Sequence, residues 1–292
     1  MNNINARKSM TGPRKEKIIE MKKKNKSPYL QTYDNLKNDL FMLKELNKHL
    51  PRSINHILDK RERKLMDKAG KLDKRSKAEF EEAANALGEV LKWEKSKKPG
   101  KKTRSVSFSV SDKTWKFVGE LVNMMGLWWG FNKFIREMSL VYLIAEFESF
   151  LESILKISFQ KKPAILASCQ KSITFEELAK FKDMNDAKQQ IMEKEVSSII
   201  NRDIEDINRY FEQKFNTELS QFTNWKKFKE RFYRRNIIIH RSGRTDKIYR
   251  LKSGYKGKDK QITVSQNYLK DSIKLLGNMG LKISEHFYNK FK

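Results

Sequence analysis

The stretch that decides the fold is REMSLVYLIAEFESFLESILKISFQ, residues 136–160. Its apolar residues recur every three or four positions and cover a broad face of a helix. That face comprises Leu140, Leu143, Ile144, Phe147, Phe150, Leu151, Ile154 and Leu155. Glutamates at positions 146, 148 and 152 interrupt the run, so it is not typical of a membrane span. We therefore predict the longest packed helix of an all-α protein here.

The same helical period recurs on both sides of this stretch. We expect the first helix to stop at Pro51, the next to start at a Ser53 cap, and the last to weaken at its two glycines. Capping boxes are predicted at Ser76 with Glu79 and at Thr174 with Glu177. The predicted helical segments are 36–51, 53–70, 76–95, 187–215, 224–243 and 265–291.

One segment has the period of a strand. RSVSFSVSD, residues 104–112, alternates Val106, Phe108 and Val110 with serines, which predicts a half-buried strand pairing within the protein. A basic strand before helices also faintly resembles a ribbon-helix-helix DNA reader. Both interpretations stay open at this point.

Composition divides the chain into four parts. Residues 1–28 are predicted to be a disordered basic tail, either solvated or engaging nucleic acid. Residues 29–103 form a basic helical region that ends in the linker KSKKPGKKTR. Residues 104–135 form a strand–helix connector, and residues 136–292 form a helical domain; at most short β pieces are expected in the chain.

The chain is strongly basic. Lys and Arg number 63 against 36 Asp and Glu, giving a formal net charge of +27 and a pI of about 9.9. This balance predicts salt-sensitive attraction to polyanions, with nucleic acid first and an anionic membrane surface second. Trp128 and Trp129 are consistent with base stacking, with a membrane interface or with an ordinary core.

Several classes of protein are not expected. Cys169 is the single cysteine, which excludes an intrachain disulfide and a thiolate metal cluster. The four histidines, at 49, 56, 240 and 286, lack zinc-site spacing, so neither a metal nor a cofactor is expected. The first residues contain no apolar segment of a secretory signal. We expect a protein of the cytoplasm without a transmembrane segment.

RRNIIIHRSG, residues 234–243, is the candidate functional stretch. Its helix should end just after His240, with Gly243 as a left-handed cap. Asn236 lies four residues before His240, so its side chain can orient the imidazole. Arg235 lies five residues before His240 and about 140° round the helix. The two converge only if the last turn loosens or if a second copy of the chain supplies one of them. The three consecutive isoleucines, 237–239, predict packing on several sides, as at an interface.

A cationic pocket with one titratable histidine suits RNA cleavage. The imidazole can exchange a proton with the ribose 2′-OH or with the leaving 5′-oxygen. An arginine can stabilise the charge that develops on the phosphorane, and no metal is required. The alternative is an ordinary helix end with a packed histidine among solvated arginines. A kinase catalytic loop is excluded, because Ser242 stands where H-R-D has Asp and no Gly-rich loop is present.

Arg235-Asn236-Ile237-Ile238-Ile239-His240 resembles the R-x4-6-H motif of the HEPN superfamily in its R-N-x-x-x-H form. The context is also similar: an upstream amphipathic helix with glutamates, a Trp-led basic helix that carries the motif, and VSQNYLKDSIKLL opening a last helix. The order resembles uncharacterised bacterial HEPN proteins found around defence loci. The resemblance covers about residues 136–291 and leaves residues 1 to about 110 uncovered.

This resemblance implies an up-down helical bundle that dimerises and brings two motifs together across a two-fold axis. Many members are metal-independent endoribonucleases that act as toxins or in antiviral defence against phage. By resemblance, Arg235 and His240 are catalytic and Asn236 orients or polarises. We expect further RNA contacts from the neighbouring arginines Arg231, Arg234, Arg241 and Arg244. The expected partners are RNA, a second copy, and an antitoxin or another defence-system protein.

Other members of the superfamily lack nuclease activity. A non-catalytic nucleic-acid-binding or scaffold protein with a HEPN-like bundle is therefore the second hypothesis, with His240 in a structural role. A peripheral membrane protein that uses the basic tail and the tryptophan pair is a weaker third.

Overall fold

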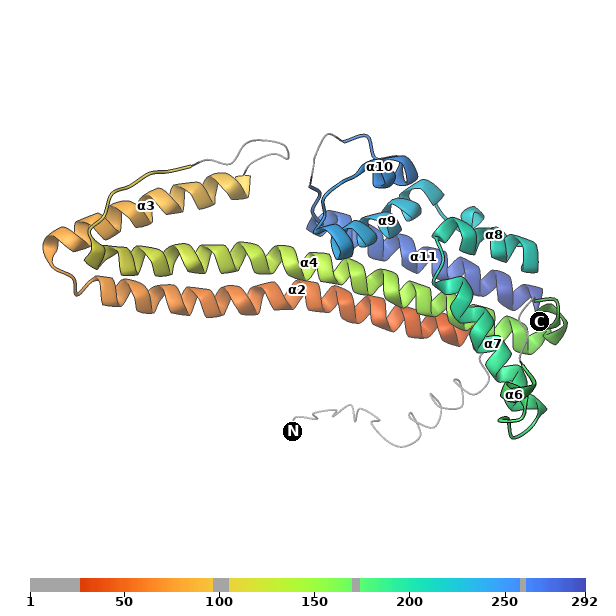
Figure 1. Cartoon of the computed structure of the whole chain (residues 1–292). Helices are drawn as coiled ribbons and strands as arrows, with labels where there is room; N and C mark the ends of the chain where they lie inside the picture. Colours follow the sequence, from red (N-terminus) through yellow and green to blue (C-terminus); the bar gives the residue numbers. More distant parts are fainter. Residues whose placement is uncertain (1–26, 97–104, 170–173, 258–260) are drawn as a thin grey trace, which may run out of the picture. The chain divides into compact units, whose positions relative to one another are not determined.

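The computed structural model describes residues 27–96, 105–169, 174–257 and 261–292. Every regular element in these ranges is a helix, which confirms the all-α class. Residues 1–26 of the predicted tail and residues 97–104 of the predicted linker lie outside them. The helices are α2 (Pro28–Ala69), α3 (Lys74–Ser96), α4 (Asp112–Lys161), α5 (Pro163–Ala167), α6 (Phe175–Leu178), α7 (Met184–Ile200), α8 (Ile204–Phe215), the 3-10 helix η1 (Leu219–Phe222), α9 (Trp225–Arg241), α10 (Lys247–Ser253) and α11 (Gln266–Lys290) (Figure 1).

The helices form two compact units, each built from separate parts of the chain. Unit 1 contains the described residues up to Leu40, together with Ile144–Phe228 and Ile273–Lys292. Unit 2 contains Phe41–Leu143 and Lys229–Ser272. The predicted boundary between residues 135 and 136 falls inside α4, which is continuous over 50 residues.

Unit 1 has a core of phenylalanines. Phe287 meets Phe211 and Phe215 edge to face, with ring centroids 5.8 and 5.6 Å apart. The first turn of α2 joins this core through Tyr29, whose hydroxyl lies 3.1 Å from Ser158 Oγ. Burial of these large rings is the main stabilising contribution in the unit.

The glycines of the last helix do not interrupt it. α11 passes through Gly277 and Gly280 without a break, contrary to the predicted weak point. A Cβ at Gly280 would lie 2.6 Å from Leu36 Cδ2, so the close approach of α2 requires the missing side chain. The glycines therefore serve helix packing.

Part of unit 2 is a long helical arm, where α2, α3 and α4 run side by side (Figure 1). Apolar residues at three- and four-residue spacing from all three helices fill its core. The buried members are Leu65, Ala69, Phe80, Ala83, Leu87, Val118, Leu121 and Met124.

Pro51 does not stop the first helix, so the predicted break there and the Ser53 cap are wrong. α2 runs through Pro51 and ends at Ala69, next to the predicted Gly70. A proline inside a helix removes one backbone hydrogen bond and costs about 3 kcal/mol. Buried residues on both sides, such as Leu43 and Leu65, hold the helix together in spite of that cost.

The predicted strand at 104–112 is also wrong, although its alternation is real. Val106, Phe108 and Val110 are half-buried against the arm core, while the serines between them are exposed. The segment is extended but has no strand partner among the described residues. Alternation in the sequence predicts which side chains are buried, but it does not predict whether the backbone pairs with another strand.

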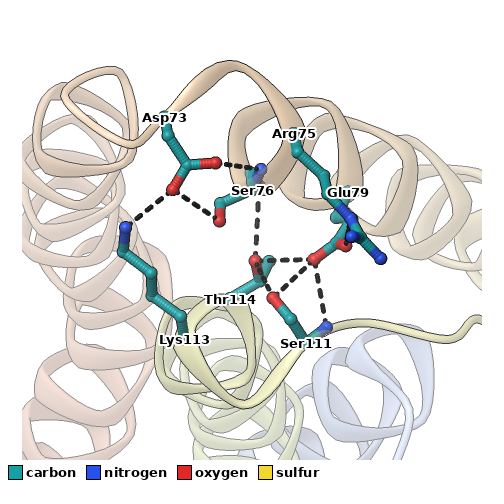
Figure 2. Close-up of polar contacts among 7 residues, drawn as sticks. All are labelled: Asp73, Arg75, Ser76, Glu79, Ser111, Lys113 and Thr114. Atoms are coloured by element: carbon teal, nitrogen blue, oxygen red, sulfur yellow. Dashed lines mark hydrogen bonds and ion pairs between the residues drawn. The ribbon is translucent and has the colours of Figure 1, made fainter.

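A polar cluster joins the start of α3 to the start of α4 (Figure 2). Asp73 caps α3 by accepting from Ser76 N at 3.0 Å, so the cap is Asp73 and not the predicted Ser76. Lys113 Nζ also donates to Asp73, at 2.6 Å. Glu79 is not part of a capping box. Its Oε2 accepts from Ser111 N and Oγ and from Thr114 Oγ1, at 2.7–3.0 Å.

The other predicted capping box, at the start of α6, is confirmed. Thr174 Oγ1 accepts from Glu177 N, and the Glu177 carboxylate accepts from Thr174 N. The two boxes differ because Glu79 has nearer donors in another segment, whereas Glu177 has Thr174 N within reach.

Candidate functional site

The helix that carries the candidate motif is α9, with its site-bearing part, Lys229–Arg241, in unit 2. Asn224 caps its first turn by accepting from Lys227 N at 3.1 Å. Phe228, Phe232 and Ile238 are buried along the helix. The basic residues of α9 therefore share a helix with an apolar face that fixes its rotation.

The C-terminal end of α9 is held by a turn of left-handed residues. Ser242 has φ +51° and Gly243 has φ +79°, which confirms the predicted left-handed glycine. Gly243 N donates to Ile237 O at 2.9 Å, and Ile262 N donates to Gly243 O at 2.9 Å. A Cβ at Gly243 would lie 2.6 Å from Ile262 O, so only glycine fits. Residues 261–262 thus fasten the end of the motif helix.

A buried polar cluster supports the same helix from within. We call it the Glu230 cluster: Glu230, Arg231, Arg234, Tyr249 and Tyr268. Glu230 Oε1 accepts from Arg234 Nε at 2.6 Å and from the Tyr249 hydroxyl at 2.7 Å. Glu230 Oε2 accepts from the Tyr268 hydroxyl at 2.6 Å and lies 3.7 Å from Arg231 Nη1. One carboxylate therefore ties α9 to α10 and α11.

Both arginines of the cluster also contact the Tyr268 ring. The guanidinium carbons of Arg234 and Arg231 lie 4.0 and 4.8 Å from its centroid, within cation–π range. Arg231 Nε donates to Ser272 Oγ at 3.1 Å, and Arg234 Nη1 donates to Thr263 O at 3.1 Å. Burial, with the Glu230 charge adding to it, raises the pKa of Tyr268 and that of Tyr249 well above the ordinary value. Both phenols therefore stay protonated as donors to Glu230.

The predicted site residues separate into two groups. Arg231 and Arg234 belong to the Glu230 cluster, and Arg231 is only 7% exposed. Their guanidinium groups are used in packing, so an RNA contact from either remains a prediction without geometric support. Asn236, His240, Arg241 and Arg244 are exposed, and Arg235 is half-buried.

In the part of the chain that the structure describes, the side chain of Asn236 lacks the hydrogen bond to His240 that was predicted from their four-residue spacing. Asn236 Oδ1 accepts from Arg235 Nη1 at 3.1 Å. Among the described residues Asn236 makes no hydrogen bond to His240, although the two are four residues apart. α9 remains helical through Arg241, so the last turn does not loosen before His240. Arg235 and His240 stay about 140° apart round one helix.

The three isoleucines do not share one environment. Ile237 and Ile238 are buried within the chain, which accounts for their packing without a second copy. Ile239 is 47% exposed and stands directly before His240. Ile239 is therefore the one isoleucine of the three that an interface with another chain would cover.

Past His240 the surface is cationic and hollowed. Arg241, Ser242 and Arg244 line an open cavity of about 390 Å³. Arg241 Nη1 lies 3.0 Å from Asp246 Oδ2, and Asp246 also caps α10 by accepting from Tyr249 N. α10 was not expected, because its sequence KIYRLKS lies outside the helical segments predicted from the sequence.

In the described ranges, no group of three or more His, Cys, Asp or Glu is placed to hold a metal ion. None of the described helices combines the length and the apolar character that crossing a membrane requires. Trp128 and Trp129 differ from each other: Trp128 donates to Asn55 Oδ1 at 2.6 Å and is half-buried, while Trp129 is exposed.

Comparison with known protein families, with curated proteins and with solved structures found no match to this chain.

The carboxylate that organises the site was not predicted from the sequence. Glu230 is the sole acidic residue of α9, in a helix that otherwise carries Lys, Arg and His as its charged residues. A lone acid among so many bases is a usable signal for a buried ion-pair network. Tyr249 and Tyr268 lie in other helices and give no comparable signal.

Proposed function

We propose that this chain is a metal-independent endoribonuclease, with its site at the C-terminal end of α9. The observation that carries the proposal is the position of His240. Its imidazole is exposed one residue before Arg241, which with Arg244 lines the cationic cavity. His240 itself does not line the cavity, but an imidazole one residue from its cations is the kind of group that general acid–base cleavage of a phosphodiester uses.

The site is proposed to be complete only in a homodimer. Arg235 and His240 project about 140° apart on one helix, so a single α9 presents them to different places. In a symmetric dimer, Arg235 from one copy can lie beside His240 from the other. Exposed Ile239 would then be covered at the contact.

The resemblance to the HEPN superfamily motivates the choice of RNA and of a defence or toxin setting. An antitoxin or another defence-system protein is a proposed partner on the same ground. These proposals rest on the motif Arg235–His240 and not on any neighbour of known function.

The alternative is a non-catalytic nucleic-acid-binding protein. One observation favours it: Asn236 bonds to Arg235, so it is not the side chain that orients His240. In that case the exposed arginines contact phosphates and cleavage never occurs.

The test is cleavage of a mixed RNA pool in EDTA by the wild type, His240→Ala and Arg235→Ala. We expect cleavage by the wild type and a loss of at least 100-fold in each variant, with RNA affinity changed by less than about threefold. His56→Ala, which removes an exposed histidine on α2, is the matched control and should cleave like the wild type. RNA left intact by the wild type, or cut equally by His240→Ala, would refute the enzyme or the site respectively.

A further inference from the structure

The first half of α4 carries an exposed apolar face that is separate from the proposed nuclease site. Trp115, Leu127 and Phe134 are 56%, 54% and 55% exposed, and Val122 is 41% exposed. The opposite side of this helix segment packs against α2 and α3 through Val118, Leu121 and Met124. We call the exposed side the α4 face. Contiguous exposed apolar side chains of this size mark an interaction surface.

The α4 face is unusual in its lack of charge. Residues 121–132, LVNMMGLWWGFN, contain no Lys, Arg, Asp or Glu in a chain that is 34% charged. A nucleic-acid surface needs cations along its length, so this stretch does not fit RNA. Two copies with a net charge of +27 repel each other, and an uncharged face is where they can approach at least cost.

Glycines along the same face lack a reason within the chain. A Cβ added at Gly119, Gly126 or Gly130 would meet nothing within 4 Å. Each glycine in a helix interior costs about 1 kcal/mol relative to alanine. Close approach of another helix would account for the missing side chains, as Leu36 does at Gly280.

The face is also self-complementary in sequence order. In an antiparallel helix pair about a two-fold axis, facing residues have numbers with a constant sum. Pairing about the midpoint of Met124 and Met125 places Trp115 opposite Phe134 of the second copy, and Gly119 opposite Gly130. Val122 then faces Leu127. Large residues then meet large ones at the ends, and Gly119 and Gly130 leave room between the centre and each end.

The charged residues fall at the ends of this pairing. Lys116 and Lys133 lie at the two margins of the face, and Lys133 Nζ is 3.9 Å from Glu137 of its own chain. In this register Lys116 faces Lys133 of the second copy and Asp112 faces its Glu137, so each margin would hold two lysines and two carboxylates. Mixed charges at the margin match the polar rim of an ordinary interface.

The available area is sufficient for a dimer. Half-exposed aromatic and aliphatic side chains on the face offer about 400 Å² of apolar surface per copy. Homodimer interfaces are about 65% apolar, which corresponds to about 600 Å² per copy. The total of about 1,200 Å² is at the lower end of standard-size interfaces. We infer that the α4 face binds a second copy of this chain in an antiparallel helix pair.

Self-association of the full chain, measured by sedimentation velocity over a range of concentrations, tests this inference. In an Ile239→Asp background, which removes the α9 contact of the proposed function, Val122→Glu should raise the dimer dissociation constant at least 100-fold, because two charges are buried without partners. Ile57→Glu in the same background, on an exposed residue of α2, is the matched control and should associate like Ile239→Asp alone. A monomeric wild type, or a Val122→Glu double variant that dimerises like Ile239→Asp alone, would overturn the inference.

Disulfide trapping tests the direction of the pair. With Cys169→Ser as background, Asn123→Cys should form a covalent dimer on oxidation, because residue 123 of each copy lies near the two-fold axis. Lys116→Cys should not, since the two residues 116 would be about 25 Å apart along the axis, beyond disulfide reach. Equal trapping of both variants contradicts the antiparallel arrangement.

A third measurement separates a membrane from a second copy. Binding of the monomeric fraction to neutral phosphatidylcholine vesicles should be absent. Binding that Val122→Glu abolishes would assign the face to a lipid surface and overturn the inference. Loss of the α4 contact in Val122→Glu, with the α9 dimer and RNA cleavage retained, would separate this face from the proposed nuclease site. Loss of cleavage in Ile239→Asp with the dimer retained would locate the nuclease contact at α9.

Discussion

Glu230 is the residue on which the geometry of the motif helix depends most. It accepts hydrogen bonds from Arg234, Tyr249 and Tyr268, and it lies near Arg231. A single, largely buried carboxylate therefore compensates two guanidinium groups, those of buried Arg231 and part-buried Arg234. Its removal leaves two cations together without a counter-ion, which is the costly way to break a buried ion pair.

Glu230→Gln should lower the free energy of unfolding by about 3 kcal/mol, as expected when one partner of a buried pair is removed. Urea unfolding followed by circular dichroism measures the change. Glu212→Gln, on an exposed glutamate of α8, is the control and should change the stability by less than about 0.5 kcal/mol. A Glu230→Gln variant as stable as the control would show that the cluster does not support the fold.

Gly243 and Gly88 give opposite predictions for the same substitution. Gly243→Ala places a Cβ 2.6 Å from Ile262 O at φ +79°, so it should destabilise the chain by about 1–3 kcal/mol. Gly88 is inside α3 with nothing within 4 Å, so Gly88→Ala should stabilise it by up to about 1 kcal/mol. Thermal unfolding of both variants checks the pair, and equal shifts of the same sign contradict the described turn.

At the scale of elements, the junction between α3 and α4 is pH-sensitive (Figure 2). Hydrogen bonds from the Ser111 hydroxyl and amide, and then from Thr114, hold the pKa of Glu79 at about 2. The Lys113 ammonium and the Ser76 cap lower the pKa of Asp73. A depressed pKa in the folded state means that the junction is fully stabilised above the ordinary carboxyl pKa and weakens as pH falls.

Amide hydrogen exchange in α3 should therefore be slow at pH 6 and should accelerate, after correction for intrinsic rates, as pH falls from about 4.5 toward 2. Glu79→Gln should flatten much of this dependence, while Glu89→Gln on the same helix should preserve it. Protection in wild-type α3 that stays constant down to pH 2 is incompatible with the assigned hydrogen bonds.

Helix content was largely predictable because 3.6-residue periodicity is a local property. The segment 136–160, the Gly70 end and the Thr174 box were all found from short-range patterns. The failures have non-local causes. Packing on both sides of Pro51 keeps α2 helical through that residue. The 105–110 segment packs against the helices of the arm instead of pairing with a strand. Neither cause is present in a short window of sequence.

The candidate site was predictable only in part. The position of α9, its end after His240 and the left-handed Gly243 followed from helix and capping rules. The burial of Arg231 and Arg234 did not, because their partners Tyr249 and Tyr268 come from other helices. Charge density alone cannot separate a cation that faces solvent from one that neutralises a buried carboxylate.

For the whole molecule, the net charge of +27 predicts strong electrostatic attraction to RNA. The exposed cations at the end of α9 should account for a measurable part of the salt dependence of RNA affinity. Replacing both Arg241 and Arg244 by alanine should lower the slope of log affinity against log salt by roughly one unit for each phosphate that is no longer neutralised. Replacing Lys71 and Lys188, two exposed cations elsewhere, serves as the control. Equal slopes in both double variants would indicate binding spread over the whole basic surface.

The central claim is a site shared between two copies, and mixing two inactive variants tests it most directly. Arg235→Ala and His240→Ala are each expected to be inactive. In a mixture equilibrated to exchange subunits, half of the dimers are mixed, and each mixed dimer has one intact site formed by Arg235 of one copy and His240 of the other. RNA cleavage in EDTA should therefore return to about a quarter of the wild-type rate. If both residues act within a single chain, or if neither is catalytic, mixing restores nothing, and that result would contradict the account.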